Sequence, residues 1–245
     1  MTGTVSLSRF KGEGPFIRRD FMLEMGKQFP QLSEASYKAK MQQVLSTGEI
    51  VRVARNTYRV DNAQRGCYSH RYSDFASTVA AQIKGKHPFL DFRIFELVQL
   101  NDFLNHQLAH NVVFLSVESD LGYFVFETLK GLYPGKVLLT PTLEMFHQYW
   151  CEDMIVIEKL PTETLRGRKE TRQTDLEKML VDLMSDKLIP SCFSESELPA
   201  IYEEAFHRYV IDESRMFRYA KRRTADKRLQ QFLSEQTDVS LQVKG

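Results

Sequence analysis

Three carboxylates lie within or next to two stretches that predict buried strands, residues 92–98 and 112–117. They are Asp91, Glu96 and Glu118. A metal-dependent nuclease needs two carboxylates that bind one magnesium ion and a lysine close by. No lysine follows Glu96 or Glu118 at short spacing, and a serine or aspartate N-cap explains the polar residues around Glu118 without chemistry. A magnesium-dependent nuclease is therefore kept as an alternative function.

Other catalytic and cofactor patterns are missing from the sequence. His106 and His110 stand four residues apart in the expected helix 100–109, but the glutamate of an HExxH zinc site is absent. The chain has no GxGxxG, GxxxxGK[ST] or GxSxG motif, and its three cysteines form no CxxC pair. We expect no catalytic residues, no metal and no cofactor, and a protein that is not an enzyme.

Residues 33–61 predict a short helix that runs into a basic β-hairpin. Ser33 is a good N-cap, apolar residues recur at helical spacing after it, and Gly48 stops the helix. Two stretches rich in β-branched and aromatic residues follow, with Arg55 and Asn56 at the expected turn. A second helix is expected at residues 18–29, and residues 16–17 are expected to add a strand to the hairpin.

Two helices followed by a hairpin are the order of a winged helix-turn-helix, which binds double-stranded DNA through a helix in the major groove and arginines on phosphates. The usual first helix is not evident, because residues 1–12 are mostly polar and predict an arm or short strand. The expected DNA-binding residues lie at the start of the first helix, on the second helix and on the hairpin: Arg18, Arg19, Ser36, Tyr37, Lys38, Lys40, Arg52, Arg55, Asn56 and Arg59.

The charge is distributed unevenly along the 245 residues. Residues 1–61 hold 10 Lys and Arg against 6 Asp and Glu, a net charge of +4, whereas residues 62–160 hold 8 against 11 and residues 161–245 hold 15 against 15. The positive excess coincides with the predicted winged helix. No apolar run approaches a membrane span, and the N-terminus lacks the apolar core of a signal peptide, so we expect a cytoplasmic protein without membrane contact.

The remaining chain predicts an α/β domain with a helical C-terminal region. Residues 62–72 are polar and aperiodic and predict a linker between a domain at 1–61 and one at 73–245. Short apolar strands alternate with helices up to residue 158, which favours a mostly parallel sheet. One long helix is expected at 213–233, with a possible second basic face for DNA: Lys221, Arg222, Arg223, Lys227 and Arg228.

Two stretches resemble the AbiEi family of bacterial type IV antitoxins, which are transcriptional regulators. The first is LSTGEIVRVARNTYRV at residues 45–60, and the second is TDLEKMLVDLMSDKL at residues 174–188, followed by EAFHRYVIDESRMFRYAKRR. The resemblance implies a protein that represses its own operon and counteracts a partner toxin resembling a nucleotidyltransferase. Glu177 and Asp182 in the second stretch are expected to be structural. Besides the nuclease, a protein-interaction module without DNA binding remains an alternative.

Overall fold

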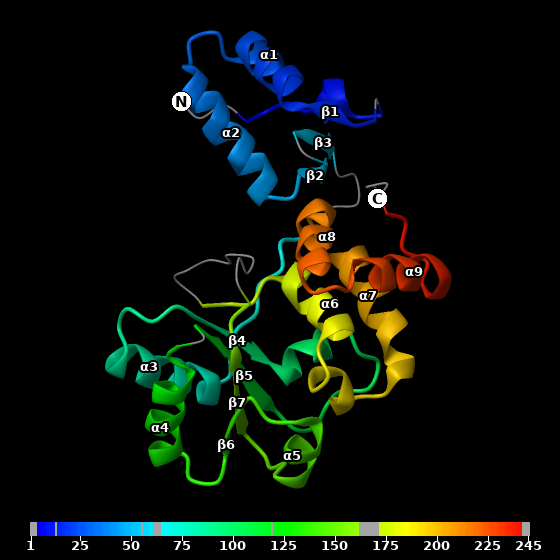
Figure 1. Cartoon of the computed structure of the whole chain (residues 1–245). Helices are drawn as coiled ribbons and strands as arrows, with labels where there is room; N and C mark the ends of the chain where they lie inside the picture. The colour runs from blue at the N-terminus through cyan, green and yellow to red at the C-terminus, as the bar shows by residue number, and fades with distance from the viewer. Residues whose placement is uncertain are drawn as a thin grey trace.

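The chain is a mixed α/β protein with two separate sheets (Figure 1). The structure is a computed structural model that describes residues 4–12, 14–54, 56–60, 65–118, 120–161 and 172–241. The N-terminal helices and the smaller sheet form one end of the molecule, and the larger sheet lies at the other (Figure 1). The C-terminal helices lie between these two parts (Figure 1). No helix in the described ranges is both long and apolar enough to cross a membrane.

The smaller sheet and two helices form the N-terminal part. Strand β1 (Phe16–Ile17) leads directly into α1 (Arg18–Gln28), and α2 (Glu34–Ser46) leads into the hairpin of β2 (Ile50–Ala54) and β3 (Thr57–Val60). The sheet has the order β1-β3-β2, and both strand pairs are antiparallel. The predicted helix at 18–29, the added strand at 16–17 and the helix followed by a hairpin are confirmed.

Local sequence explains where α2 begins and ends. The Ser33 hydroxyl accepts a hydrogen bond from the backbone N–H of Ser36 at 3.3 Å, so the predicted N-cap is confirmed. Gly48 follows the helix with φ +76°, a conformation that favours glycine. A Cβ at Gly48 would lie 2.7 Å from the carbonyl oxygen of Arg65, so this turn requires glycine for space as well.

A 3-10 turn, η1 (Ser8–Phe10), occupies the place before β1. Its Phe10 is buried and stacks on Phe16 with ring centroids 4.1 Å apart, and Val5 and Leu7 are buried in the same core. The expected arm or short strand is therefore wrong for residues 5–10, because their apolar side chains complete the core between α1 and the hairpin, and residues 8–10 form a 3-10 turn. The buried positions alternate with serines and an arginine, and this concealed them in a mostly polar stretch.

The larger sheet is mixed. It has the order β4-β5-β7-β6, in which β4 (Phe92–Glu96) is antiparallel to β5 (Val112–Val117), while β7 (Met154–Lys159) is parallel to both β5 and β6 (Val137–Leu139). The connection between β4 and β5, residues 97–111, contains the 3-10 helix η2 (Leu97–Asp102) in place of an α-helix, and β5 returns as an antiparallel neighbour of β4. The predicted strands occur at the expected positions, but a helix at 100–109 does not.

Helices cover both faces of the larger sheet. α3 (Asp74–Lys86) and α4 (Gly122–Leu132) pack on one face around Ile94, Leu115 and Ile157. The other face packs against α5 (Leu143–Gln148), α6 (Leu176–Ser185) and the following C-terminal helices. The strands β4 and β5 are buried throughout, which explains why most of their residues are apolar; their polar residues Arg93, Glu96 and Ser116 are buried as well.

The C-terminal region is helical, as expected. α7 (Leu198–Arg208) is followed by α8 (Glu213–Arg222) and α9 (Asp226–Gln236). The prediction of one helix at 213–233 is wrong, because Thr224 has φ +56° and ends α8 before α9 begins. A left-handed residue breaks the helical hydrogen-bond pattern, and the buried Ala225 then starts the new helix.

The two ends of the molecule adjoin through the C-terminal region. α8 packs against β2 (Figure 1). Within the predicted linker, the Gly66 N–H donates to the Arg208 carbonyl oxygen at 3.0 Å, and the Val210 N–H donates to the Gly66 carbonyl oxygen at 2.9 Å. Residues 62–64 of this stretch lie outside the described residues. The segment at residue 66 therefore runs along the helical region and is tied to it.

Candidate functional site

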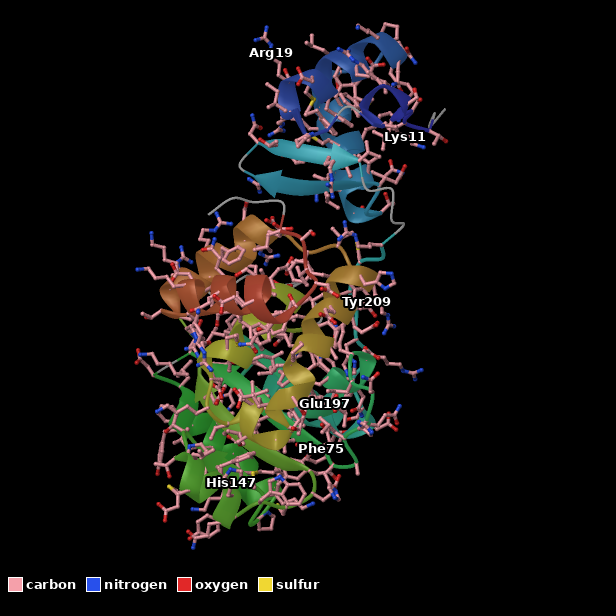
Figure 2. All side chains as sticks on the ribbon, turned by 90° about the vertical axis from the view of Figure 1, so that its right-hand side faces the viewer. Lys11, Arg19, Phe75, His147, Glu197 and Tyr209 are labelled. Carbon is pink, nitrogen blue, oxygen red and sulfur yellow. The ribbon has the colours of Figure 1, made fainter. Side chains whose placement is uncertain are left out.

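The N-terminus of α1 adjoins the turn of the hairpin. The backbone N–H of Arg18 donates a hydrogen bond to the carbonyl oxygen of Asn56 at 3.1 Å. Asn56 has φ +63° and is exposed, which confirms it at the turn. Arg18 and Arg19 are exposed at the first positions of α1, and Arg19 projects outward from the N-terminal part (Figure 2). Two of the segments predicted to contact phosphate thus form one corner of the molecule.

The electrostatics of this corner favour an anion. The N-terminus of a helix carries a partial positive charge and backbone N–H groups without helical acceptors. Arg18 and Arg19 add two positive charges at a helix end where acidic residues are normally stabilising. Asp20 is the acidic residue of the first turn, and its carboxylate accepts from the Ile17 N–H at 3.2 Å. A phosphate group that binds here would gain from the helix end and from both guanidinium groups.

The α2 residues that were predicted to bind DNA differ in how exposed they are and in whether they already have a structural role. The Tyr37 hydroxyl donates to the Phe29 carbonyl oxygen at 2.9 Å, and Ser36 takes part in the N-cap, so both have structural roles. Lys38 is exposed and pairs with Glu34 at 2.9 Å. Lys40 is half-buried, with its ammonium 4.2 Å from the centre of the Phe29 ring. The helix therefore offers one exposed lysine and one partly covered lysine.

The arginines of the hairpin do not share one face. Arg52 is paired with Tyr58 across the hairpin, whereas Arg59 is paired with Val51, and cross-strand partners point to the same side. Consecutive pairs alternate sides, so Arg52 and Arg59 point to opposite faces. Both are half-buried, and both interact with other groups of the chain. The side chain of the third predicted hairpin arginine, Arg55, lies outside the described residues.

The predicted second basic face is divided. Lys221, Arg222, Lys227 and Arg228 are exposed. Arg223 turns inward and donates from Nε to the Ser185 hydroxyl at 3.1 Å, and Arg228 donates to the Met184 carbonyl oxygen at 3.3 Å. The break between α8 and α9 separates these residues further, so the structure does not form a single basic helix face from the five side chains.

The carboxylates of the nuclease alternative do not meet. Phe92 pairs with Val117, which places Asp91 and Glu118 at one end of the β4–β5 pair, whereas Glu96 pairs with Val113 at the other end. Asp91 is held by the guanidinium groups of Arg93 and Arg172 at 2.5 and 2.7 Å. Within the described residues, no group of three or more histidine, cysteine or acidic side chains could hold a metal ion.

Glu96 has a structural role that explains its burial. Its carboxylate accepts from the Ser73 N–H at 2.9 Å, the Ser73 hydroxyl at 2.6 Å and the Asn111 amide at 2.7 Å, and it lies 3.4 Å from the His70 ring. Burial alone would raise the pKa of Glu96, but these hydrogen bonds outweigh it and hold the pKa below its usual value. The carboxylate thus fixes the start of α3 to β4, because Ser73 is the N-cap of that helix.

The two histidines that the sequence placed on one helix lie in a loop. His106 contacts Glu197 at 3.3 Å, and His110 contacts Glu152. The two imidazoles therefore have separate carboxylate partners. By contrast, the prediction that Glu177 and Asp182 are structural agrees with their contacts, since Glu177 accepts from the Asp212 N–H at 3.0 Å and Asp182 accepts from the Tyr219 hydroxyl at 3.0 Å.

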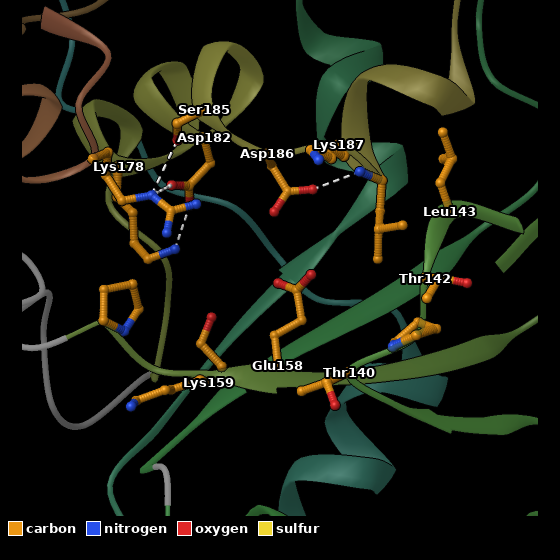
Figure 3. A pocket seen from close by; sticks show the side chains of 15 residues that line it. Thr140, Thr142, Leu143, Glu158, Lys159, Lys178, Asp182, Ser185, Asp186 and Lys187 are labelled. Atoms are coloured by element: carbon orange, nitrogen blue, oxygen red, sulfur yellow. Dashed lines mark hydrogen bonds and ion pairs between the residues drawn. The ribbon is translucent and has the colours of Figure 1, made fainter. Parts of the chain in front are cut away.

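A pocket of about 640 Å³, lined by charged and apolar side chains, was not predicted from the sequence (Figure 3). It lies where β5, β6 and β7 end at their carboxyl ends, and α6 forms the opposite wall. Glu158, near the end of β7, points into it (Figure 3). The available signal was its position directly after the apolar run 154–157, because open α/β sheets place ligands at the carboxyl ends of parallel strands.

Comparison with known proteins gives one family match. A model described as a family of unknown function (DUF6577) matches residues 36–239. The match begins inside α2 and includes the hairpin, the larger sheet and the C-terminal helices. No curated protein and no solved structure matches the chain.

Proposed function

We propose that this chain, which belongs to the DUF6577 family, is a DNA-binding transcriptional regulator whose N-terminal part is a winged helix-turn-helix. The observation that carries the proposal is the corner formed by Arg18, Arg19 and the Asn56 turn. It combines a helix N-terminus, two exposed guanidinium groups and a hairpin turn, a combination suited to phosphates of a DNA backbone.

The order of elements supports the winged-helix assignment. α1 and α2 are joined by five residues, 29–33, and the hairpin β2–β3 follows α2 directly. Strand β1, from before α1, pairs with β3 and completes a three-stranded sheet behind the two helices. The turn η1 occupies the position of the usual first helix and supplies Phe10 to the core. In this arrangement α2 is the recognition helix, and Lys38 and Lys40 are the side chains directed at DNA.

The covered face of β2 shapes the expected contact. Because α8 packs against β2, DNA would meet the turn of the hairpin and the start of α1 while the outer face of β2 stays covered. The expected phosphate contacts are therefore concentrated at Arg18, Arg19 and the turn. Lys221, Arg222 and Lys227 remain candidates for a separate, weaker contact.

The antitoxin role and the toxin partner rest on the resemblance of residues 45–60 and 174–188 to the AbiEi family. In the present structure the first stretch forms the end of α2 and the hairpin, and the second forms α6. We infer that the larger domain contacts a nucleotidyltransferase-like toxin encoded beside this gene. Co-expression with the neighbouring gene product tests this part, because rescue of growth and co-purification are both expected.

Fluorescence anisotropy with the protein's own upstream DNA tests DNA binding. Substituting Lys40→Ala should change the preference between that DNA and a scrambled duplex by about 1–3 kcal/mol if Lys40 reaches a base. Equal binding to both duplexes by the unaltered protein would remove the regulator proposal. Lys136→Ala, in the half-buried turn before β6, is the matched control, and it should leave the preference unchanged.

A further inference from the structure

Two carboxyl groups in the pocket between the larger sheet and α6 have no cationic partner among the residues that the structure describes. Glu158 lies on β7 and Asp186 directly follows α6, and both line the pocket (Figure 3). One Asp186 oxygen accepts from the N–H groups of Leu188 and Ile189 at 2.7 and 3.2 Å. Among the described residues the Glu158 carboxyl has no hydrogen-bond partner, although it is partly buried and points into the cavity. These two groups are therefore the ones that a ligand would satisfy.

Two of the four cations that line the pocket, Lys178 and Arg223, are already paired, whereas Lys159 and Lys187 line it as exposed side chains. The Lys178 ammonium is bound to one Asp182 oxygen, and Arg223 lies 3.7 Å from the other. Arg223 also donates to the Ser185 hydroxyl, and the Tyr219 hydroxyl donates to Asp182. Lys178 and Asp182 are both buried, so this group forms a fixed wall of the pocket. This ion-pair group does not neutralise the carboxyl groups of Glu158 and Asp186.

This arrangement changes the protonation of Glu158. Burial, together with the charge of Asp186, raises the pKa of Glu158 to about 8. Asp182 acts in the same direction, while Lys178 and Arg223 act against it. Near neutral pH the Glu158 carboxyl is therefore mostly protonated, and a bound cation would take the place of this proton.

We propose that this pocket binds a small organic cation, with a guanidinium or ammonium group held between Glu158 and Asp186. Such a group has several N–H donors, which suits two converging carboxylates. Pro141, Leu143 and Pro161 line another part of the pocket and would contact an aliphatic stem. A metal ion fits less well, because no cluster of three or more metal-ligating side chains occurs in the described ranges. The proposal is independent of DNA binding.

Isothermal titration calorimetry of the full chain with agmatine tests the proposal. Agmatine carries a guanidinium at one end and an ammonium at the other, and 1,4-butanediol is its uncharged control. Because the bound cation replaces the proton on Glu158, binding at pH 7 should release about 0.9 proton per site, measured by comparing buffers of different ionisation enthalpy. Affinity should rise about tenfold between pH 6 and pH 7.

Substitutions identify the site. Glu158→Gln should weaken agmatine binding at pH 8 at least about tenfold and abolish proton release, since the amide can neither ionise nor attract the cation. Glu144→Gln, an exposed carboxylate in the first turn of α5, is the matched control and should bind as the unaltered protein does. A circular dichroism spectrum confirms folding of each variant. Absence of binding up to about 10 mM, binding without proton release, or unchanged binding by Glu158→Gln would each overturn the proposal.

Discussion

Replacing Glu96 with glutamine tests whether this carboxylate is structural. The substitution keeps the shape of the side chain but converts one acceptor oxygen into a donor. The Ser73 N–H would then face an N–H₂ group and lose its partner, whereas His70 can adapt by changing its tautomer. An unsatisfied buried donor costs about 1–3 kcal/mol, and loss of charge weakens the bonds from Asn111 and the Ser73 hydroxyl by about 1 kcal/mol more.

The expected loss for Glu96→Gln is therefore about 2–4 kcal/mol at pH 7, or a fall in Tm of about 4–16 °C by calorimetry for a chain of this size. The pKa of Glu96 is lowered in the folded state, so its contribution is present above the unfolded pKa and is lost as the pH falls through the folded pKa. The difference between the two proteins should thus shrink below about pH 4.5.

Glu118→Gln is the control, because Glu118 is exposed at the other end of the same strand pair. Its Tm should change by no more than about 2 °C, as for other exposed sites. The structural explanation of Glu96 would be refuted if Glu96→Gln were as stable as Glu118→Gln at neutral pH. Incubation of the unaltered protein and both variants with plasmid and Mg²⁺ tests the nuclease alternative. That alternative requires the unaltered protein to cleave the plasmid and each variant to cleave it less.

Three further substitutions have defined outcomes. Asn56→Gly should leave the Tm nearly unchanged while Asn56→Val lowers stability by about 1–2 kcal/mol, because the left-handed turn opposes a branched side chain. Asp182→Asn should cost about 3–5 kcal/mol in urea unfolding, since Lys178 and Arg223 lose their shared partner, and a stable variant would contradict the ion-pair assignment. As the pH rises from 4.5 to 8, Glu158→Gln should become more stable relative to the unaltered protein, by up to about 1.4 kcal/mol per pH unit. The reason is that the raised folded pKa of Glu158 stabilises the unaltered native state only while this carboxyl is protonated. Parallel stability curves for the two proteins would contradict this.

Local signals in the sequence were sufficient to predict the elements of the N-terminal part. Ser33, Gly48 and Asn56 each have a conformational or capping role that can be recognised without tertiary structure. The residues before Phe16 were harder, because Phe10 is buried only through its contact with a strand and a helix that come later in the chain. Thr224 gave no signal either, since threonine rarely adopts positive φ and the apolar spacing continued through it.

The arrangement of the candidate site residues depends on strand pairing, which the periodicity of apolar residues in the sequence does not specify. The positions of Arg52 and Arg59 on opposite faces follow from the hairpin register, and the separation of Glu96 from Asp91 and Glu118 follows from the antiparallel β4–β5 pair. Alternating strands and helices predict a parallel sheet, but the connection between β4 and β5 contains the 3-10 helix η2 in place of the expected helix at 100–109, and β5 returns antiparallel to β4. Glu158 was overlooked because its neighbours Asp182 and Asp186 come from α6 and the residue after it.

The salt dependence of DNA binding tests the central claim most directly. The variant Arg18→Ala/Arg19→Ala removes two exposed charges beside the hairpin turn, and Lys84→Ala/Lys86→Ala removes two exposed charges from the end of α3. Anisotropy titrations on the upstream DNA at several salt concentrations give the slope of log K against log[salt]. The arginine variant should bind more weakly and have a slope smaller by about 1.8, while the lysine variant keeps the original slope. Equal slopes for all three proteins, or no salt dependence at all, would contradict the account.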